Sequence, residues 1–319
     1  MRKMPLNNKA QKLADKLENE KEQIIHSTEE MSAELKRLLE REIDAFQKRE
    51  KHRSTEMLAI FARHNFYANG FTPEELRTTL EDLGPTYVKI GQIMSSRVDL
   101  LPAEYCRELE KLRDSVKPLD PAVAKAVIEQ ETGKKIDEIY TEFRDEPLGS
   151  ASIAQVHYGV LKDGTRVVTK VQRPLIADMM RKDFLLLNKL ADCVNVIEED
   201  SDEQVIDFKS VIAEVERVTK AELDFRVEAE NTRLFREKCL DDEELISCPA
   251  VIDDLTTERI FTMTYIDGCS VANTEKLAAE GCDPDEIGRV IVDSYMHQVL
   301  DVGIFHADPH QGNILVSHG

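Results

Sequence analysis

Two β-rich runs joined by an Asp-Gly turn constrain the fold of this chain more than any other feature. The runs span residues 153–160 and 165–172, and the connection between them contains Asp163-Gly164. Because Asp-Gly readily adopts the backbone conformations of tight turns, the pattern predicts an antiparallel hairpin. Successive side chains of a strand point to opposite faces, so Val168 and Lys170 share one face of the second strand. A lysine at the centre of such a strand is expected to have a charged partner.

Helical patterns lie on both sides of the hairpin. Thr72-Pro73-Glu74-Glu75 contains a complete helix start, in which Thr72 is the cap, Pro73 occupies the first turn and Glu75 closes the capping box. Further helices are expected at 86–97, 102–113, 121–133, 175–192, 204–238 and 284–303, and another strand at 257–264. The sequence therefore predicts an α+β protein, with residues 61–135 as a compact all-helical unit.

The composition excludes several classes of protein. The chain has 319 residues and a net charge of −20, which opposes binding to phosphate backbones, so nucleic acid is not an expected partner. No run of about 18 consecutive apolar residues suits a membrane-spanning helix, and the N-terminus does not resemble a secretory signal. The 6 cysteines lack zinc-like spacing and are expected to be reduced. We therefore expect a cytoplasmic protein.

Two features near the hairpin favour chemistry on phosphates. Residues 147–157 form a run rich in small side chains, which lets backbone N–H groups approach a polyphosphate. Lys170 ends Val167-Val168-Thr169-Lys170, and in protein kinases the lysine of a similar V-A-I-K strand contacts the α- and β-phosphates. Each feature alone also has a purely structural interpretation, a tight turn or a solvated edge lysine.

Two further features contribute acidic and amide groups. The acidic segment 214–226 offers carboxylate partners for Lys170, and its Glu222-x-Asp224 pair is a candidate for holding Mg²⁺ or positioning a lysine. In His306-Ala307-Asp308-Pro309-His310-Gln311-Gly312-Asn313, the aspartate and asparagine have the spacing of the kinase catalytic loop H-R-D-x-x-x-x-N. That spacing allows one carboxylate to face the nucleophile while the amide reaches the metal.

Together these motifs resemble the UbiB family of atypical kinases, the aarF-domain proteins of coenzyme Q biosynthesis. The resemblance covers about residues 53–319 and includes Lys89-Ile90-Gly91-Gln92, which carries the KxGQ motif. It implies a protein kinase-like fold with a helical KxGQ N-terminal extension and a C-lobe that is incomplete in this chain. The implied domains are a charged helical extension (1–60), the KxGQ extension (61–145), a kinase-like N-lobe (146–266) and the start of the C-lobe (267–319).

The resemblance also implies roles for individual residues. Asp308 would be the catalytic-loop aspartate, and Lys89 would be either catalytic or an obstacle to protein substrates. Glu216 would be the ion-pair partner of Lys170, with Glu214 as the alternative. The residues implied to bind ATP or ADP are Ala151, Ser152, Val168, Lys170, Glu216, Met263, Tyr265 and Ile266. Mg²⁺ would be bound by Asn313, with Glu222 and Asp224 as further candidate ligands.

The implied function is that of an atypical kinase or ATPase that supports isoprenoid-quinone (ubiquinone) biosynthesis or lipid homeostasis. A quinone precursor or another isoprenoid lipid would be its further partner, with peripheral contact at the inner face of a membrane. The alternative is a non-catalytic module that binds a lipid or a partner and is switched by nucleotide. A kinase also needs an Asp-Phe-Gly aspartate about 12–20 residues after the asparagine. Since Asn313 is followed by only six residues, we expect a fragment with little turnover of its own.

Overall fold

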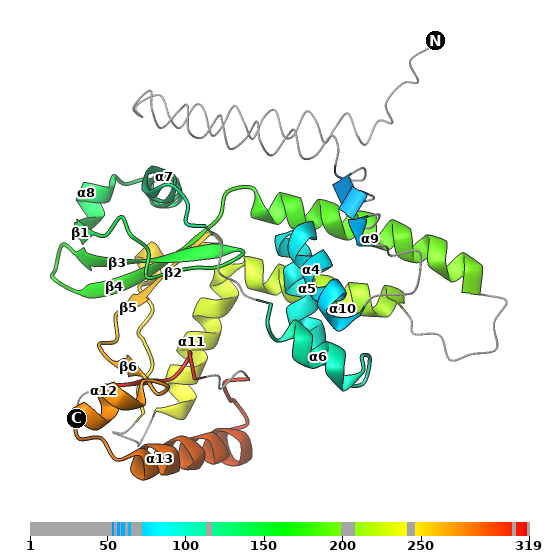
Figure 1. The fold of residues 1–319 in the computed structure, drawn as a ribbon. Helices are drawn as coiled ribbons and strands as arrows, with labels where there is room; N and C mark the ends of the chain where they lie inside the picture. The colour runs from blue at the N-terminus through cyan, green and yellow to red at the C-terminus, as the bar shows by residue number, and fades with distance from the viewer. Residues whose placement is uncertain are drawn as a thin grey trace.

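The computed structural model describes residues 53, 56, 57, 59, 60, 63, 64, 72–112, 117–198, 208–240, 246–307 and 311–317. The helices are α4 (Pro73–Leu83), α5 (Pro85–Ser95), α6 (Ala103–Leu109), α7 (Pro121–Thr132), α8 (Ile136–Ile139), α9 (Ile176–Glu198), α10 (Phe208–Leu223), α11 (Phe225–Cys239), α12 (Thr274–Ala279) and α13 (Pro284–His297). The strands are β1 (Tyr140–Phe143), β2 (Gly149–Ser150), β3 (Ala154–Leu161), β4 (Arg166–Gln172), β5 (Ile260–Thr264), β6 (Cys269–Ser270) and β7 (Leu315–Val316). The architecture is mixed helix and sheet, as predicted (Figure 1).

The predicted hairpin forms the centre of an antiparallel sheet. In the described part of the chain the strand order is β1-β3-β4-β5, and β2 pairs with β3. The turn between β3 and β4 is closed by hydrogen bonds from the Leu161 N–H to the Thr165 carbonyl and from the Gly164 N–H to the Leu161 carbonyl. Gly164 has a φ of 88°, a left-handed conformation that favours glycine. Because β4 pairs with β3 on one side and with β5 on the other, Lys170 lies in the middle of a central strand.

The two faces of the sheet are covered by different helices (Figure 1). One face packs against α7 and α8 through a core that joins Val127 and Ile128 to Val167 and Val171. The other face packs against α11, where Phe225 and its neighbours contact Ala154 and Phe261. The helix α7 thus packs on the sheet and not in the compact unit with α4–α6 that the sequence predicted.

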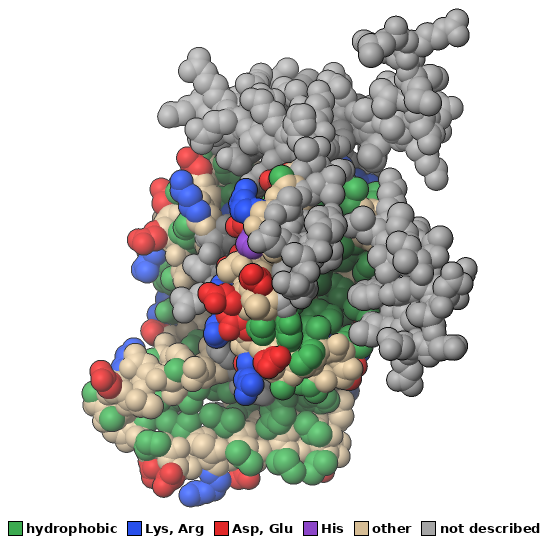
Figure 2. Space-filling view, turned by 45° about the vertical axis from the view of Figure 1, so that its right-hand side comes forward, with side chains coloured by type: hydrophobic (Ala, Val, Ile, Leu, Met, Phe, Trp, Pro, Cys, Tyr) green, Lys and Arg blue, Asp and Glu red, His purple; other side chains and the backbone are tan. Residues whose placement is uncertain are grey.

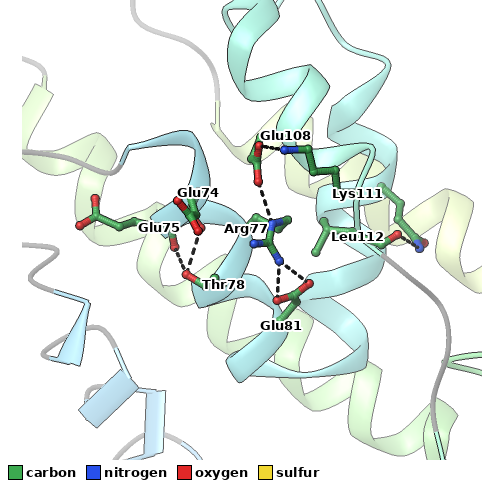
Figure 3. A network of polar contacts seen from close by, with 9 residues as sticks. Glu74, Glu75, Arg77, Thr78, Glu81, Glu108, Lys111 and Leu112 are labelled. Carbon is green, nitrogen blue, oxygen red and sulfur yellow. Dashed lines mark hydrogen bonds and ion pairs between the residues drawn. The ribbon is translucent and has the colours of Figure 1, made fainter.

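The helical extension is built from α4, α5 and α6. Thr72 caps α4, its hydroxyl accepts the Glu75 N–H, and the Glu75 carboxylate accepts the Thr72 N–H, so the predicted capping box is confirmed. Those hydrogen bonds to Thr72 lower the pKa of the Glu75 carboxyl. Arg77 of α4 donates to Glu108 of α6 at 2.9 Å, and Lys111 contacts the same carboxylate (Figure 3). These contacts join the first and last helices of the extension.

The extension rests on the long helices α9 and α10. Ile90 and Ile93 of α5 pack against a core formed by Met180 and Phe184 of α9 and Val215 of α10. At Gly91 a side-chain β-carbon would lie 2.3 Å from the Leu112 Cδ1 and 2.8 Å from the Leu80 Cδ1. The glycine of the KxGQ motif therefore allows α5 to approach its neighbours closely.

The C-terminal elements lie at the lower end of the molecule (Figure 1). Here β6 pairs with β7, and α13 continues into a π-helical turn, Gln298–Val302. Hydrophobic side chains gather at this end (Figure 2), and exposed ones on α13 and the π-helical turn include Val292, Met296, Val299 and Leu300.

Two expectations about the whole chain concern membranes and thiols. Among the described residues, no helix combines the length and the apolarity that crossing a membrane requires. The free cysteines in that part include Cys106, Cys239, Cys248, Cys269 and Cys282. The charged helical extension predicted at 1–60 lies almost wholly outside the described residues.

Candidate functional site

Lys170 forms an ion pair across the face of the sheet that α11 covers. Its Nζ donates to the Glu228 carboxylate at 2.7 Å and lies 4.8 Å from the centroid of the Phe225 ring. Both partners are partly shielded, with 26% of the Lys170 side chain and 41% of the Glu228 side chain exposed. The sheet and α11 therefore hold a lysine and a carboxylate in a fixed geometry.

The prediction that Glu216 is the ion-pair partner of Lys170 is wrong. The carboxylate of Glu216 pairs with Lys220 at 2.7 Å and accepts a hydrogen bond from Asn188. The alternative, Glu214, pairs with Arg217. The sequence predicted one helix over 204–238, whereas the helix breaks at Asp224 and α11 starts in a new direction against the sheet. That break brings the first turn of α11, with Glu228, to Lys170.

The small-residue loop lies next to this pair, between β2 and β3. The N–H of Ala151 donates to the Ala154 carbonyl at 2.8 Å, which closes the loop. Arg173, directly after β4, donates to the Ala151 carbonyl at 2.9 Å and to the Ser150 hydroxyl at 2.7 Å. Ser152 is 2% exposed, and among the described residues nothing accepts a hydrogen bond from its N–H. Buried N–H groups are normally paired, so this amide fits a ligand that supplies an oxygen acceptor.

The residues expected to hold adenine lie at the end of β5. Val168 of β4 is in register with Met263 of β5, on the same face of the sheet as Lys170. Tyr265 follows β5, donates its N–H to the Arg166 carbonyl, and contacts Tyr158 edge to face with ring centroids 5.2 Å apart. Ile266 is the next residue and is partly buried. Strand pairing thus places Val168 and Met263 side by side, with Tyr265 just beyond them.

Lys89 and Glu222 also form an ion pair, which connects the extension to α10. Their charged atoms are 2.9 Å apart, and the other Glu222 oxygen, Oε2, is buried with no hydrogen-bond partner among the described residues. The neighbouring Asp224 caps α11 and receives two side-chain hydrogen bonds from Arg226, which lower the pKa of its carboxyl. Lys89 of the KxGQ motif therefore does lie beside the Glu222-x-Asp224 pair.

This arrangement bears on the expected metal ligands. The described residues contain no group of three or more His, Cys, Asp or Glu side chains that suits a metal ion. Glu222 pairs with Lys89, and Asp224 pairs with Arg226. Because each carboxylate already neutralises a positive charge, the two do not fit Mg²⁺ in this arrangement. Asn313 lies two residues before β7. That it binds Mg²⁺ stays a prediction from the sequence.

The predicted catalytic loop is described only in part, and Asp308 lies outside the described residues. The residue two places before it, His306, is held through its backbone on both sides. Its carbonyl accepts a hydrogen bond from the Tyr295 hydroxyl at 2.7 Å, and its N–H donates to the Gln298 side chain at 3.3 Å. The end of α13 and the π-helical turn therefore fix the start of this loop.

Sequence reasoning assigned no role at this site to Glu228 or Arg173. A signal for Glu228 was present, because Asp224 is a preferred helix cap and marks a new helix start within the acidic segment. Arg173 follows the predicted strand directly, but a pattern of strands does not reveal which loop a long side chain reaches. Only the fold brings both residues to Lys170 and the small-residue loop.

Comparison with known proteins places this geometry in a family. The family model described as "ABC1 atypical kinase-like domain" matches residues 111–319. The chain is 40% identical over 273 residues to "Uncharacterized protein in hydrogenase 1 5'region" from Clostridium pasteurianum, covering 83% of this chain and 51% of that protein. It is 38% identical over 241 residues to "Protein ACTIVITY OF BC1 COMPLEX KINASE 8, chloroplastic" from Arabidopsis thaliana, covering 76% of this chain and 31% of that protein. The chain thus spans about half or less of the length of these two relatives.

A solved structure is also similar. The structure described as "The complex structure of Rv3197-erythromycin from Mycobacterium tuberculosis" matches with a TM-score of 0.53 and 25% sequence identity, covering 84% of this chain and 63% of that one. The predicted kinase-like fold is therefore confirmed, as is the resemblance to the UbiB, or ABC1, family. The chain belongs to the ABC1 atypical kinase-like family.

Proposed function

We propose that this protein binds an adenine nucleotide with Mg²⁺ and acts as an atypical kinase or ATPase. The observation that carries the proposal is the ion pair between Lys170 and Glu228 at 2.7 Å. A lysine held by a helix carboxylate is the arrangement with which kinases orient the α- and β-phosphates. The name of the relative from Arabidopsis thaliana, which includes the word kinase, supports the same class.

The groups around the ion pair favour one orientation of a bound nucleotide, with the phosphates at the small-residue loop and the purine at Val168 and Met263. The Ser152 N–H, for which the described residues offer no acceptor, and the small side chain of Ala151 lie in the loop next to β3, where they suit phosphate oxygens. Val168 and Met263 offer apolar contact at the other end of the same face. When bound, Mg²⁺ supplies positive charge to the phosphates. Asn313, which lies among the described residues, is the proposed ligand of this ion. Lys170 would neutralise phosphate charge, and Glu228 would keep its ammonium group in place.

Thermal unfolding of the whole chain with and without Mg-ATP tests this proposal. A ligand at about 100 times its Kd stabilises the protein that binds it by about 2.7 kcal/mol. We expect Mg-ATP to raise the Tm of the wild type, Lys170→Ala to abolish the rise, and Lys220→Ala to retain it. Lys220 is a matched control because it is a lysine of α10 that pairs with Glu216 away from the loop. An equal rise in wild type and Lys170→Ala would contradict the proposal.

The second partner of the reaction is proposed from the family resemblance. UbiB-like proteins support isoprenoid-quinone biosynthesis or lipid homeostasis, so a quinone precursor or another isoprenoid lipid is the proposed partner, met at the inner face of a membrane. Flotation of the chain with liposomes of anionic phospholipid, with and without ubiquinone, tests this. Flotation that ubiquinone increases is the expected result, and no flotation with either liposome would contradict it.

A non-catalytic, nucleotide-switched module is the second candidate function. The ion pair between Lys89 and Glu222 favours it, because it fastens the KxGQ extension to α10 beside the nucleotide face. Release of inorganic phosphate from ATP under single-turnover conditions, with the chain in excess over ATP, separates the two candidates, because it detects even the little turnover expected of this chain. An enzyme releases phosphate in a manner that Lys170→Ala abolishes, whereas a switched module binds Mg-ATP and releases none.

A further inference from the structure

Arg173 connects the small-residue loop to two other parts of the chain. Its Nε donates to the Ala151 carbonyl, and its Nη2 donates to the Ser150 hydroxyl at 2.7 Å and to the Lys117 carbonyl at 3.0 Å. Its own N–H donates to the Ile153 carbonyl at 2.8 Å. Arg173 therefore holds three residues of the loop and the segment that leads into α7.

The contact with Ala151 determines the orientation of the next amide. No peptide bond among the described residues is cis, and in a trans peptide the C=O and the following N–H point to opposite sides. Since Arg173 binds the Ala151 carbonyl, the Ser152 N–H points away from the guanidinium. This is the amide for which the described residues offer no acceptor.

The linker before α7 is held at a second point. The Leu119 N–H donates to the Gln155 side chain at 2.9 Å, and Gln155 is fully buried at the start of β3. The segment that contacts Arg173 through Lys117 is thus attached to the sheet itself. Arg173 therefore follows β4 directly and donates a hydrogen bond to a linker that is itself attached to the sheet.

We propose that Arg173 is a positioning residue that holds the loop so that the Ser152 N–H is oriented to bind a nucleotide phosphate. This inference rests on the proposed nucleotide site. An amide already oriented before the ligand arrives binds it without the entropic cost of ordering the loop. Arg173 itself contacts the loop and not the phosphates, so its effect is confined to ligands that carry phosphates.

The test compares affinities for Mg-ADP and for adenosine, which lacks phosphates. We expect Arg173→Ala to weaken Mg-ADP binding by about tenfold, because the Ser152 N–H loses its hydrogen bond to the charged phosphate, and to leave adenosine binding unchanged. Added guanidinium ion should restore part of the Mg-ADP affinity, and Arg173→Lys should bind between wild type and Arg173→Ala. Arg181→Ala, which removes an exposed arginine of α9 paired with Asp178, is the control and should bind as the wild type does.

The outcomes separate this inference from the proposed function. Equal Mg-ADP affinity in wild type and Arg173→Ala, with binding lost in Lys170→Ala, would overturn the role of Arg173 and leave the nucleotide site intact. Equal weakening of Mg-ADP and adenosine would show a general structural role and also overturn it. Absence of Mg-ADP binding by the wild type would contradict both.

A second measurement needs no nucleotide and covers the case in which Arg173→Ala is poorly folded. In the folded Arg173→Lys protein, hydrogen exchange of peptides that cover residues 149–153 should be faster than in the wild type, because lysine cannot make the forked contacts of arginine. Peptides from α13 serve as the internal reference. Unchanged exchange in the loop would overturn the inference.

Discussion

The Lys170 ammonium group lies 2.7 Å from the Glu228 carboxylate, and this pair spans the gap between the central strand of the sheet and the first turn of α11. Two features of the sequence produce it. Strand alternation turns Lys170 towards α11, and the helix break at Asp224 places Glu228 over the sheet. The proposed nucleotide site is built around this pair.

The first prediction compares substitutions of Glu228, the partner of Lys170 in the structure, and of Glu216, the partner expected from the sequence. Glu228→Gln removes the charge that holds Lys170, so the Tm increase caused by Mg-ATP should fall sharply. Glu216→Gln should retain the increase, because Glu216 pairs with Lys220. Thermal unfolding of the two variants at one Mg-ATP concentration measures this. The reverse ranking would show that Glu216 holds Lys170 in solution.

The difference between these two glutamates shows where prediction from sequence ends. Local signals were sufficient for the capping box at Thr72 and for the hairpin at Asp163-Gly164, because neighbouring residues determine both structures. The partner of Lys170 depends on how α10 and α11 pack on a sheet formed by distant segments. The helical pattern over 204–238 continues on both sides of Asp224, and a capping residue alone does not show in which direction the next helix runs.

The strand and helix that precede residue 146 illustrate the same limit. Tyr140 of β1 and Ile128 of α7 belong to one core with the central strands, although the predicted boundary assigns them to the extension. Nothing in the helical pattern of α7 distinguishes packing on a sheet from packing on another helix. Amphipathic periodicity indicates that a face is buried, and the rest of the fold determines its partner.

The second prediction concerns the glycine of the KxGQ motif. Gly91→Ala places a methyl group against Leu112 and Leu80 in a buried contact. Overpacking of this kind costs about 1–3 kcal/mol, and the higher helix propensity of alanine offsets about 1 kcal/mol of that. We expect a net loss in the free energy of unfolding of about 1 kcal/mol, measured by urea denaturation.

Gly288→Ala is the matched control for Gly91→Ala. Gly288 lies within α13, and a side-chain β-carbon there would contact nothing within 4 Å. The substitution should therefore be neutral or stabilise the protein by about 0.5–1 kcal/mol. Equal effects of the two substitutions would contradict the close approach of α5 to its neighbours.

The third prediction is a pH dependence of stability that arises from His157. This side chain is buried, contacts the Arg144 carbonyl through Nδ1 at 2.9 Å, and contacts Gln155 through Nε2 at 2.7 Å. Burial lowers the pKa of His157 below its usual 6.5. The unfolded chain therefore binds a proton more readily than the folded one, and stability falls as the pH drops from about 7 through the lowered pKa.

Urea denaturation between pH 7.5 and about 5.5 measures this effect, over the range in which an unperturbed histidine titrates. His157→Asn keeps a donor for the Arg144 carbonyl but removes the titrating ring. Its stability should be lower at pH 7.5 and should fall less towards acid than that of the wild type. The same slope in both proteins would contradict the assignment.

The fourth prediction concerns the ion pair between Lys89 and Glu222, which joins the extension to α10. Their side chains are 19% and 36% exposed, so solvent weakens the attraction. A double-mutant cycle with Lys89→Met and Glu222→Gln should give a coupling energy of about 0.5–1 kcal/mol in the free energy of unfolding. Strict additivity of the two substitutions would show that the pair does not join the helices in solution.

The most direct test of the central claim is a crystal structure of the chain with a non-hydrolysable ATP analogue and Mg²⁺. We predict that phosphate oxygens lie within hydrogen-bond distance of the Lys170 Nζ and of the Ser152 N–H, with the base against Val168 and Met263. A nucleotide bound elsewhere on the protein, or phosphates that contact neither Lys170 nor the loop, would contradict the account.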